Sequence, residues 1–400
     1  MHSHLAPPDR FSRLAGVFVA ILYAVAFLTP QPMPVVGGVV ALSLFSWSWA
    51  RSGRPDLPRG LVVALSLFIA WGLMSAVWSL DSGITLKKSA QLFGTALMAV
   101  LLVATANALP EQARATMRRC ALWGGAALVA ATAVEGYGGL PWRSLVAALG
   151  WSDHALPHTL NRTTLIMVLL SWPAAMAAIR LARPGWAAVL VLAAAVVPLG
   201  LDSGTAVLAA AGGLVTAATA WVASRLIGAT TPRLLAAVFV PGAAGALYLA
   251  SRAYQWIAND AVPVSLHHRF HIWEFAVRHG MEKALTGWGL GISRAMPNFG
   301  EEPIFTGPGT DIIPLHTHNT YVQVFMETGF VGFALFTLGT AFMIAATRHW
   351  ARTDQVCAAG VFGAVAASWL TGYGAWQSWW LASLALLGFL MVALRQRATA

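Results

Sequence analysis

Residues 318–346 read HNTYVQVFMETGFVGFALFTLGTAFMIAA, a stretch that contains one carboxylate, Glu327, and no lysine or arginine. A helix that crosses the hydrocarbon core of a bilayer needs about 20 consecutive apolar residues. This stretch is long enough, and a polar pair, His318 and Asn319, opens it. We therefore predict a membrane-spanning helix at 318–346.

Similar apolar runs recur along the whole chain, which is 58% hydrophobic and 10% charged. Soluble domains are roughly a quarter charged, and a membrane β-barrel would alternate apolar and polar residues. Neither description fits, so we predict an all-α polytopic membrane protein with about 12 transmembrane helices. The other runs lie at 12–29, 33–50, 60–79, 88–107, 119–136, 162–179, 185–201, 204–224, 233–251, 355–372 and 374–394.

The formal net charge of +10 comes from basic residues in short loops between these runs. Cytoplasmic loops of membrane proteins are enriched in lysine and arginine. With the N-terminus inside, every inner segment holds at least two basic residues, and 16 of the 25 lie inside. We therefore expect a multi-pass protein of a bacterial inner membrane with both termini in the cytoplasm. The charge should contact anionic membrane lipids rather than nucleic acid.

One long periplasmic loop, 252–317, lies between the ninth and tenth spans on this topology. It separates nine spans in 1–251 from three spans and a short cytoplasmic tail in 318–400. Helical spacing at 265–285 predicts an amphipathic helix at the membrane surface, with apolar residues Phe270, Trp273, Val277, Met281 and Ala284. Eight of the eleven histidines lie outside, where we expect the chemistry: His154, His158, His267, His268, His271, His279, His316 and His318.

The pair His318-Asn319 permits two interpretations. In the first, Thr317 or Asn319 caps the helix, His318 lies at the lipid headgroups, and glycines allow close packing. In the second, His318 is a base at the boundary between water and lipid, because an imidazole titrates near neutral pH and can take a proton from a hydroxyl. Spacing alone favours the first interpretation.

Arginines near the outer surface suggest an anionic ligand. Arg162 begins the sixth span and Arg269 lies on the amphipathic helix. A guanidinium binds phosphate oxygens with two parallel hydrogen bonds, so both residues suit a lipid-linked diphosphate. The alternative is that each arginine anchors a helix end at the interface. Lys87 and Lys88 also lie outside and could bind the same anion or lipid headgroups.

We expect no metal and no other cofactor. The histidines around position 268 lack the HExxH pattern, because position 268 is His rather than Glu, and no group of acids accompanies them. Glu327 lies roughly 13 Å beyond His318 at the rise of an α-helix. At that depth we expect a buried, paired or protonated acid rather than a catalytic one.

Two motifs resemble the O-antigen ligase and O-antigen polymerase superfamily. His318-Asn319, nine further residues and Gly329-Phe330-Val331-Gly332-Phe333 are similar to that superfamily's histidine–asparagine signature. The run 268–273, followed by the glycine-rich run 285–291, resembles its arginine–tryptophan helix and Gly-x-Gly stretch. Together the motifs cover about 70 residues. The layout of twelve spans with one late outer loop resembles the GT-C-like fold of these ligases.

The resemblance implies a metal-independent, inverting glycosyltransferase of lipopolysaccharide biosynthesis. Its donor would be an O-antigen polysaccharide on undecaprenyl diphosphate, and its acceptor a sugar hydroxyl of lipid A–core. It implies that His318 is the general base and that Arg269 binds the diphosphate. Arg162 would assist Arg269, and the residues expected to support them are Asn319, His316, His271 and Trp273.

One departure from the family concerns its second arginine. Members often carry this arginine in a Ser-Arg-Gly-like stretch, whereas 201–206 reads LDSGTA here. Arg162 is therefore our candidate for that role. An O-antigen polymerase or a protein O-oligosaccharyltransferase would share donor and fold, so both alternatives stay open. A polysaccharide transporter or flippase would need polar groups at the membrane midplane and repeated halves, and the sequence shows no repeat.

Overall fold

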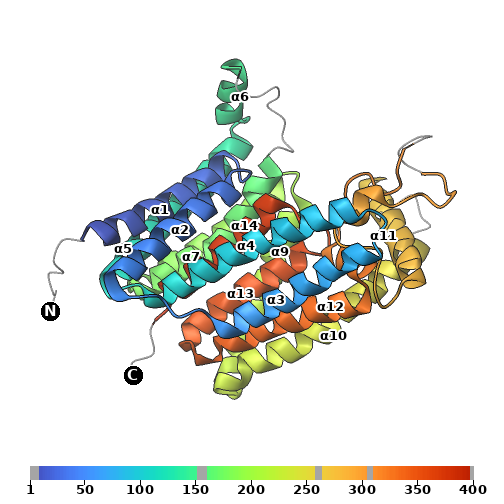
Figure 1. Cartoon of the computed structure of the whole chain (residues 1–400). Helices are drawn as coiled ribbons and strands as arrows, with labels where there is room; N and C mark the ends of the chain where they lie inside the picture. The colour runs from blue at the N-terminus through green and yellow to red at the C-terminus, as the bar shows by residue number, and fades with distance from the viewer. Residues whose placement is uncertain (1–8, 151–159, 257–263, 304–309, 397–400) are drawn as a thin grey trace.

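The computed structural model describes residues 9–150, 160–256, 264–303 and 310–396, and these are helical or irregular, with no β-strand. Two predicted outer histidines, His154 and His158, lie outside the described residues. The α-helices are α1 (Arg10–Leu28), α2 (Met33–Ser52), α3 (Arg59–Met74), α4 (Ser82–Ala108), α5 (Glu111–Tyr137), α6 (Pro141–Ala148), α7 (Asn161–Arg180), α8 (Pro184–Val196), α9 (Gly204–Leu226), α10 (Thr231–Trp256), α11 (Val264–Glu282), α12 (Thr320–Ala346), α13 (Arg352–Ser368) and α14 (Ser378–Leu394). The long helices pack side by side in a bundle, and α11 lies at one end of it (Figure 1).

Every apolar run identified in the sequence overlaps one of these helices. Within the described residues, nine helices are long and apolar enough to cross a membrane. They include α12, which begins at Thr320 where the sequence predicted a span. The remaining three runs form shorter helices: α8, which continues as a 3-10 turn to Gly200, α13 and α14. The chain is thus an all-helical polytopic membrane protein, and a count of twelve crossings stays a prediction.

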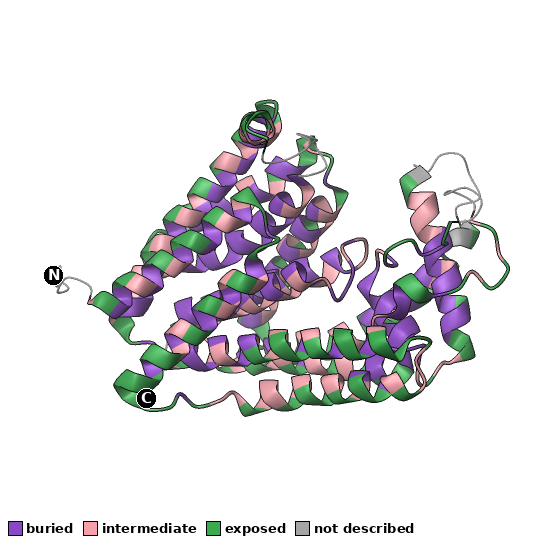
Figure 2. Ribbon diagram, turned by 45° about the horizontal axis from the view of Figure 1, so that its top comes forward, coloured by how far each residue is buried: buried purple, intermediate pink, exposed green. Residues whose placement is uncertain are grey.

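The outward surface of the bundle is apolar. Within α3, Gly72 is the only buried residue although the helix is hydrophobic throughout. Val35 on α2, Phe93 on α4 and Val215 on α9 are each more than 60% exposed. Figure 2 shows such exposed positions along the outer faces of the helices, with buried positions between them. Contiguous apolar surface of this kind suits contact with lipid rather than water.

The described ends of the chain lie at one end of the bundle, and α11 lies at the other (Figure 1). We call these the terminal end and the α11 end. Arginines that the sequence places inside gather at the terminal end. Arg51 pairs with Asp9 at 2.6 Å, Arg180 pairs with Asp354 at 2.6 Å, and the Nε of Arg118 donates to the carbonyl of Leu394 at 3.1 Å. This grouping agrees with the expected charge asymmetry.

Helix α11 forms where the sequence predicted a helix, and two residues of the predicted apolar stripe, Trp273 and Val277, are buried. Met281, also expected on this stripe, is 52% exposed, and the helix ends at the next residue. Phe275 and Ala276, outside the predicted stripe, are fully buried as well. The helix packs against α10 and α12, so the protein interior selects its buried side. Periodicity alone did not reveal these partners. The position of α11 at the membrane surface stays a prediction.

The loop after α11 pairs its backbone with α12, and two glycines make this possible. Gly329 leaves helical geometry at φ 65° and ψ −171°. The N–H groups of Trp288 and Gly289 donate to the carbonyls of Met326 and Glu327 at 3.0 and 2.8 Å. A Cβ on Gly287, whose φ is +67°, would lie 2.4 Å from the backbone of Glu327. The glycine-rich signature is thus a site of close backbone contact.

We expect Gly287→Ala to destabilise the protein by at least about 3 kcal/mol, because the methyl group would collide with backbone that cannot move aside. Gly300→Ala is the control, since Gly300 has a φ of +80° but open space around its Cβ position. That control should lose only about 1–2 kcal/mol from backbone strain. Thermal unfolding in detergent measures both, and equal losses would refute the crowding argument.

Candidate active site

The turn before α12 is fixed from two sides. Asn319 caps the helix, because its Oδ1 accepts the N–H groups of Tyr321 and Val322 at 3.0 and 3.2 Å. The capping interpretation is therefore confirmed for Asn319. The indole of Trp273 on α11 donates to the carbonyl of Thr317 at 2.7 Å. Both Asn319 and Trp273 thus act on the backbone that carries His318.

His318 lies on this turn in a strained conformation, with a φ of +56°. Burial, together with the positive charges of Arg269 and His268, lowers the pKa of His318 to about 4. A hydrogen bond to the carbonyl of Gly372 opposes this shift. One ring nitrogen thus donates to Gly372, which leaves the other able to accept a proton. At pH 7 the imidazole of His318 is neutral.

His316 lies beside His318 and supports its position. The backbone N–H of His318 donates to Nδ1 of His316 at 3.1 Å, and the two ring centroids are 4.1 Å apart. Burial lowers the pKa of His316 to about 3, helped by the charges of His318, Arg269 and Arg294. The charge of Arg269 therefore acts on both imidazoles, although Arg269 comes from α11.

Arg269 and Arg162 converge on Tyr373, in the loop between α13 and α14. Burial raises the pKa of Tyr373 to about 12, and the charges of both arginines oppose this rise. Burial also lowers the pKa of Arg269, and Tyr373 opposes that change. The guanidinium of Arg162 lies 5.5 Å from the Trp379 ring, which packs edge-on against Tyr373 at 4.7 Å. The structure thus brings the two predicted arginines to one place.

The sequence analysis missed Tyr373, because no local motif marks it. Its neighbour Thr371 accepts a hydrogen bond from Thr205 on α9 at 3.1 Å. Thr205 belongs to the stretch 201–206, which was compared above with the Ser-Arg-Gly-like stretch of the superfamily. This stretch therefore lies close to the loop that Arg162 approaches from α7.

His271 faces a different group of charges from those around His318. Burial lowers the pKa of His271, while the carboxylates of Glu274 and Glu301 oppose this and Arg278 favours it. Arg278 holds Glu301 through two hydrogen bonds of 2.9 and 2.7 Å. The pKa of Glu301 falls to about 2, chiefly because of Arg278. This ionic group, which the sequence analysis did not identify, attaches the loop after α11 to α11 itself.

A polar cavity of about 380 Å³ adjoins His316 and Trp379. Lys88 and Arg294 bring positive charge to it, whereas exposed Lys87 does not line it. Two indoles and several amide and hydroxyl groups form the rest of its wall. The lining residues are Gln31, Lys88, Gly291, Ser293, Arg294, Leu315, His316, Gln323, Gly374, Trp376, Gln377, Ser378 and Trp379.

Glu327 links several residues that line this cavity. Its carboxylate accepts the N–H of Gly291 at 2.5 Å and the indole N–H of Trp376 at 2.5 Å. Gln323 donates to it at 2.9 Å, and Ser293 donates through both its backbone N–H and its hydroxyl. Five donors from three segments thus satisfy one fully buried carboxylate. The acid is structural, as its depth suggested.

Comparison with known proteins finds a similarity in this part of the chain. Residues 188–337 match the family model described as O-antigen ligase. We call these residues the matched region. It begins in α8 and ends in α12, so it includes Arg269, His318 and Glu327 but neither Arg162 nor Tyr373.

Curated relatives agree with this match over part of their length. A protein of Rickettsia conorii and one of Rickettsia typhi, both named as candidate polysaccharide ligases, are 28% and 26% identical to this chain over 125 and 131 residues. These alignments cover 31% of this chain and 30–31% of the relatives. The chain therefore matches less than a third of each relative.

The side chains that could bind a metal ion do not form a cluster in the described residues. Within the described part of the chain, no three His, Cys, Asp or Glu side chains come close enough to share an ion. The titratable groups that do come together are the two neutral imidazoles and the basic side chains around them. That arrangement can accept a proton and bind an anion.

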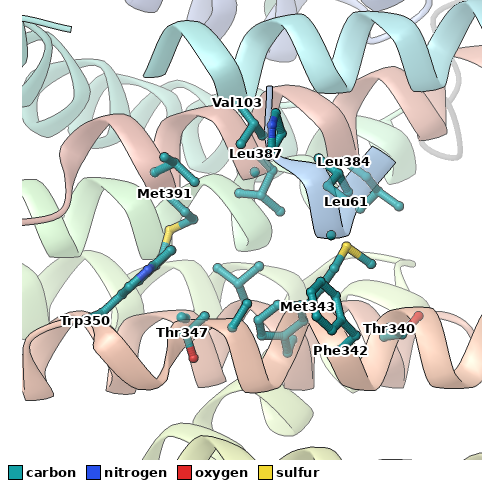
Figure 3. A pocket seen from close by; sticks show the side chains of 18 of the residues that line it. Leu61, Val103, Thr340, Phe342, Met343, Thr347, Trp350, Leu384, Leu387 and Met391 are labelled. Atoms are coloured by element: carbon teal, nitrogen blue, oxygen red, sulfur yellow. The ribbon is translucent and has the colours of Figure 1, made fainter. Parts of the chain in front are cut away.

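Apolar cavities lie deeper in the bundle, between α3, α4, α12 and α14. The larger, about 490 Å³, is lined by side chains such as Leu61, Met343 and Met391 (Figure 3). The second, about 300 Å³, shares part of this lining and reaches Thr320 and Trp376. Trp376 also lines the polar cavity. Apolar space therefore extends from the terminal end of the bundle to Thr320, close to His318.

We expect Glu327→Gln to lower the free energy of unfolding by about 3 kcal/mol, because a carboxamide NH₂ would face donors that now share a carboxylate. Glu274→Gln is the control, since its partly exposed pairing with Arg278 contributes at most about 1 kcal/mol. Thermal unfolding in detergent compares the two variants. A Glu327→Gln protein as stable as the control would show that the charge is dispensable.

Proposed function

We propose that this chain is an O-antigen ligase. It transfers preassembled O-antigen polysaccharide from undecaprenyl diphosphate to a sugar hydroxyl of lipid A–core, on the periplasmic side of the bacterial inner membrane. The reaction inverts the anomeric centre and needs no metal. The observation that carries this proposal is a neutral imidazole, His318, held close enough to the Arg269 guanidinium for that charge to lower its pKa.

The donor's two chemical parts suit two parts of the structure. The diphosphate binds Arg269 and Arg162 near Tyr373, since guanidinium groups pair well with phosphate oxygens. The apolar cavities between α3, α4, α12 and α14 take the isoprenoid chain, because burial of its methylene groups is favourable there. Trp376 lies where the apolar cavity meets the polar one.

His318 activates the acceptor. The acceptor hydroxyl attacks the anomeric carbon as His318 removes its proton, and the bond from that carbon to the diphosphate oxygen breaks. The diphosphate leaves with the bonding electrons, and Arg269 stabilises the negative charge that develops. The hydrogen bond from His318 to Gly372 orients the ring throughout this step.

Donor binding improves the base. In the free protein, the charge of Arg269 lowers the pKa of His318. A bound diphosphate neutralises that charge and brings a negative charge close to the imidazole, so the pKa of His318 rises toward its ordinary value. The imidazole therefore stays neutral in the free protein, where its pKa is low, and becomes a stronger base when the donor is in place.

Arg162 takes the part of the family's second arginine. The stretch 201–206 has no arginine, yet Thr205 within it contacts the Thr371 end of the loop that carries Tyr373. The charge of Arg162 reaches Tyr373 from α7. The guanidinium of Arg162 on α7 thus acts on the loop between α13 and α14, which Thr205 on α9 also contacts.

We expect His318→Gln to reduce kcat for transfer by about 10²- to 10⁴-fold, because the variant cannot accept the hydroxyl proton. The assay uses purified protein, a glycan on undecaprenyl diphosphate, lipid A–core and no added nucleotide or metal. His349→Gln, at the other end of α12, is the matched control. Full transfer by a folded His318→Gln protein would overturn the mechanism.

The arginine variants belong in the same assay. Arg269→Gln should lose about 10²- to 10³-fold in kcat, as expected when a group that stabilises the leaving charge is removed. Arg162→Gln should chiefly raise KM for the donor. In cells, deletion of a ligase leaves bare core and accumulated lipid-linked polymer, whereas deletion of a polymerase leaves core with one repeat. The second pattern would replace ligase with polymerase.

The pH dependence should differ between free and donor-bound protein. The pKa of His318 is about 4 in the free protein, so kcat/KM for the donor should fall only as the pH drops toward that value. The acid limb of the pH profile of kcat reports His318 in the donor complex. It should lie at higher pH, because the bound diphosphate raises the pKa of His318. An acid limb of kcat at or below that of kcat/KM would contradict this coupling.

A further inference from the structure

The polar cavity beside His316 carries two cations that the proposed mechanism does not use. Lys88 comes from α4, and Arg294 comes from a 3-10 turn, Ile292–Ala295, after the glycine-rich loop. Their charges lie close enough to interact, and the charge of Arg294 also lowers the pKa of His316. The cavity thus has its own positive field next to the proposed base.

The side chain of Lys88 packs against Gly291, which has no Cβ to obstruct it. A Cβ on Gly291 would lie 2.8–3.3 Å from the aliphatic stem of Lys88. Gly291 has a φ of +83°, and its N–H donates to Glu327. The Nζ of Lys88 donates to the amide oxygen of Gln91 at 3.0 Å. The loop that carries Gly291 and the lysine stem therefore fit closely against each other.

Neither cation forms a direct ion pair with a carboxylate in the described part of the chain, although the charge of Glu327 acts on Lys88. None of the ion pairs between described residues includes Lys88 or Arg294. Glu327, the buried acid nearby, already accepts five hydrogen bonds from other groups. Two like charges that face one cavity repel each other, so an anion between them would be bound favourably.

The remaining wall of the cavity suits a sugar. Trp376 and Trp379 line the cavity with aromatic side chains, and aromatic surface suits the C–H face of a pyranose. Gln377 and Ser378 provide amide and hydroxyl groups for hydrogen bonds with sugar hydroxyls. Trp379 also separates this cavity from Arg162, which lies over its ring. The cavity is therefore a neighbour of the proposed diphosphate site and distinct from it.

We propose that this cavity binds the acceptor saccharide through a phosphate group on one of its sugars, with Lys88 and Arg294 as the phosphate ligands. The proposal rests on the proposed ligase function and adds a specificity determinant to it. Arg269 and Arg162 serve the donor's diphosphate, while Lys88 and Arg294 serve the acceptor. His316 and His318 lie between the two sites, where the acceptor hydroxyl must meet the anomeric carbon.

The first experiment measures binding without catalysis. The probes are core oligosaccharide that carries its phosphates and the same material after phosphatase treatment, and the protein is the full chain in lipid nanodiscs. Wild type should bind the phosphorylated form at least about tenfold more tightly. Lys88→Gln and Arg294→Gln should lose this preference, whereas Lys87→Gln should keep it. Equal binding of both probes by wild type would overturn the proposal.

The second experiment assigns the phosphate to one substrate. In the transfer assay, Lys88→Gln and Arg294→Gln should raise KM for phosphorylated acceptor about tenfold, with little change in KM for the donor. With dephosphorylated acceptor, variants and wild type should behave alike. A rise in donor KM instead would mean that these residues bind the donor's diphosphate, which would overturn the acceptor assignment.

The two experiments also separate this inference from the proposed function. A wild-type protein that prefers phosphorylated oligosaccharide but transfers no glycan would refute the ligase function while the phosphate site remained. A protein that transfers glycan but ignores acceptor phosphate would refute the phosphate site alone. Thermal unfolding of each variant verifies that it is folded before either result is interpreted.

Discussion

A buried carboxylate in a lipid-embedded bundle must receive hydrogen bonds from the protein, because the surrounding hydrocarbon offers none. Glu327 meets this requirement with five donors from the glycine-rich loop, α12 itself and the segment before α14. Because Ser293 and Trp376 are far apart in sequence, satisfying one acid brings distant segments together. The positions of the polar cavity and the turn before α12 depend on this interaction.

Around this anchor, the α11 end of the bundle concentrates positive charge, and among the described residues that line the polar cavity there is no carboxylate. Arg269 and Arg162 approach Tyr373, while Lys88 and Arg294 line the polar cavity. Burial keeps the intervening imidazoles neutral. The like charges of such a site repel one another, so a bound anion, as in the proposed reaction, would stabilise it. Binding and chemistry are therefore coupled through the same electrostatic field.

The sequence predicted most of the helices, because long apolar runs and charged loops are local signals. It also placed His318 and Arg269 in one motif-bearing region, and the structure shows their electrostatic contact. It predicted only part of the buried surface of α11, since α10 and α12 also cover Phe275 and Ala276 and leave Met281 exposed. Tyr373 and Arg294 reach the site only through tertiary packing, and no residue spacing reveals such proximity. The structural role of Gly287 became clear only from its close approach to Glu327.

The indole of Trp376, which donates to Glu327, comes from the segment before α14, 49 residues after the acid in the sequence. During synthesis, the glycine-rich loop and α12 leave the ribosome before Trp376 does, so the Glu327 carboxylate gains this donor only after α12 has been made. The wall of the polar cavity is consequently complete only once the segment before α14 has packed against α12.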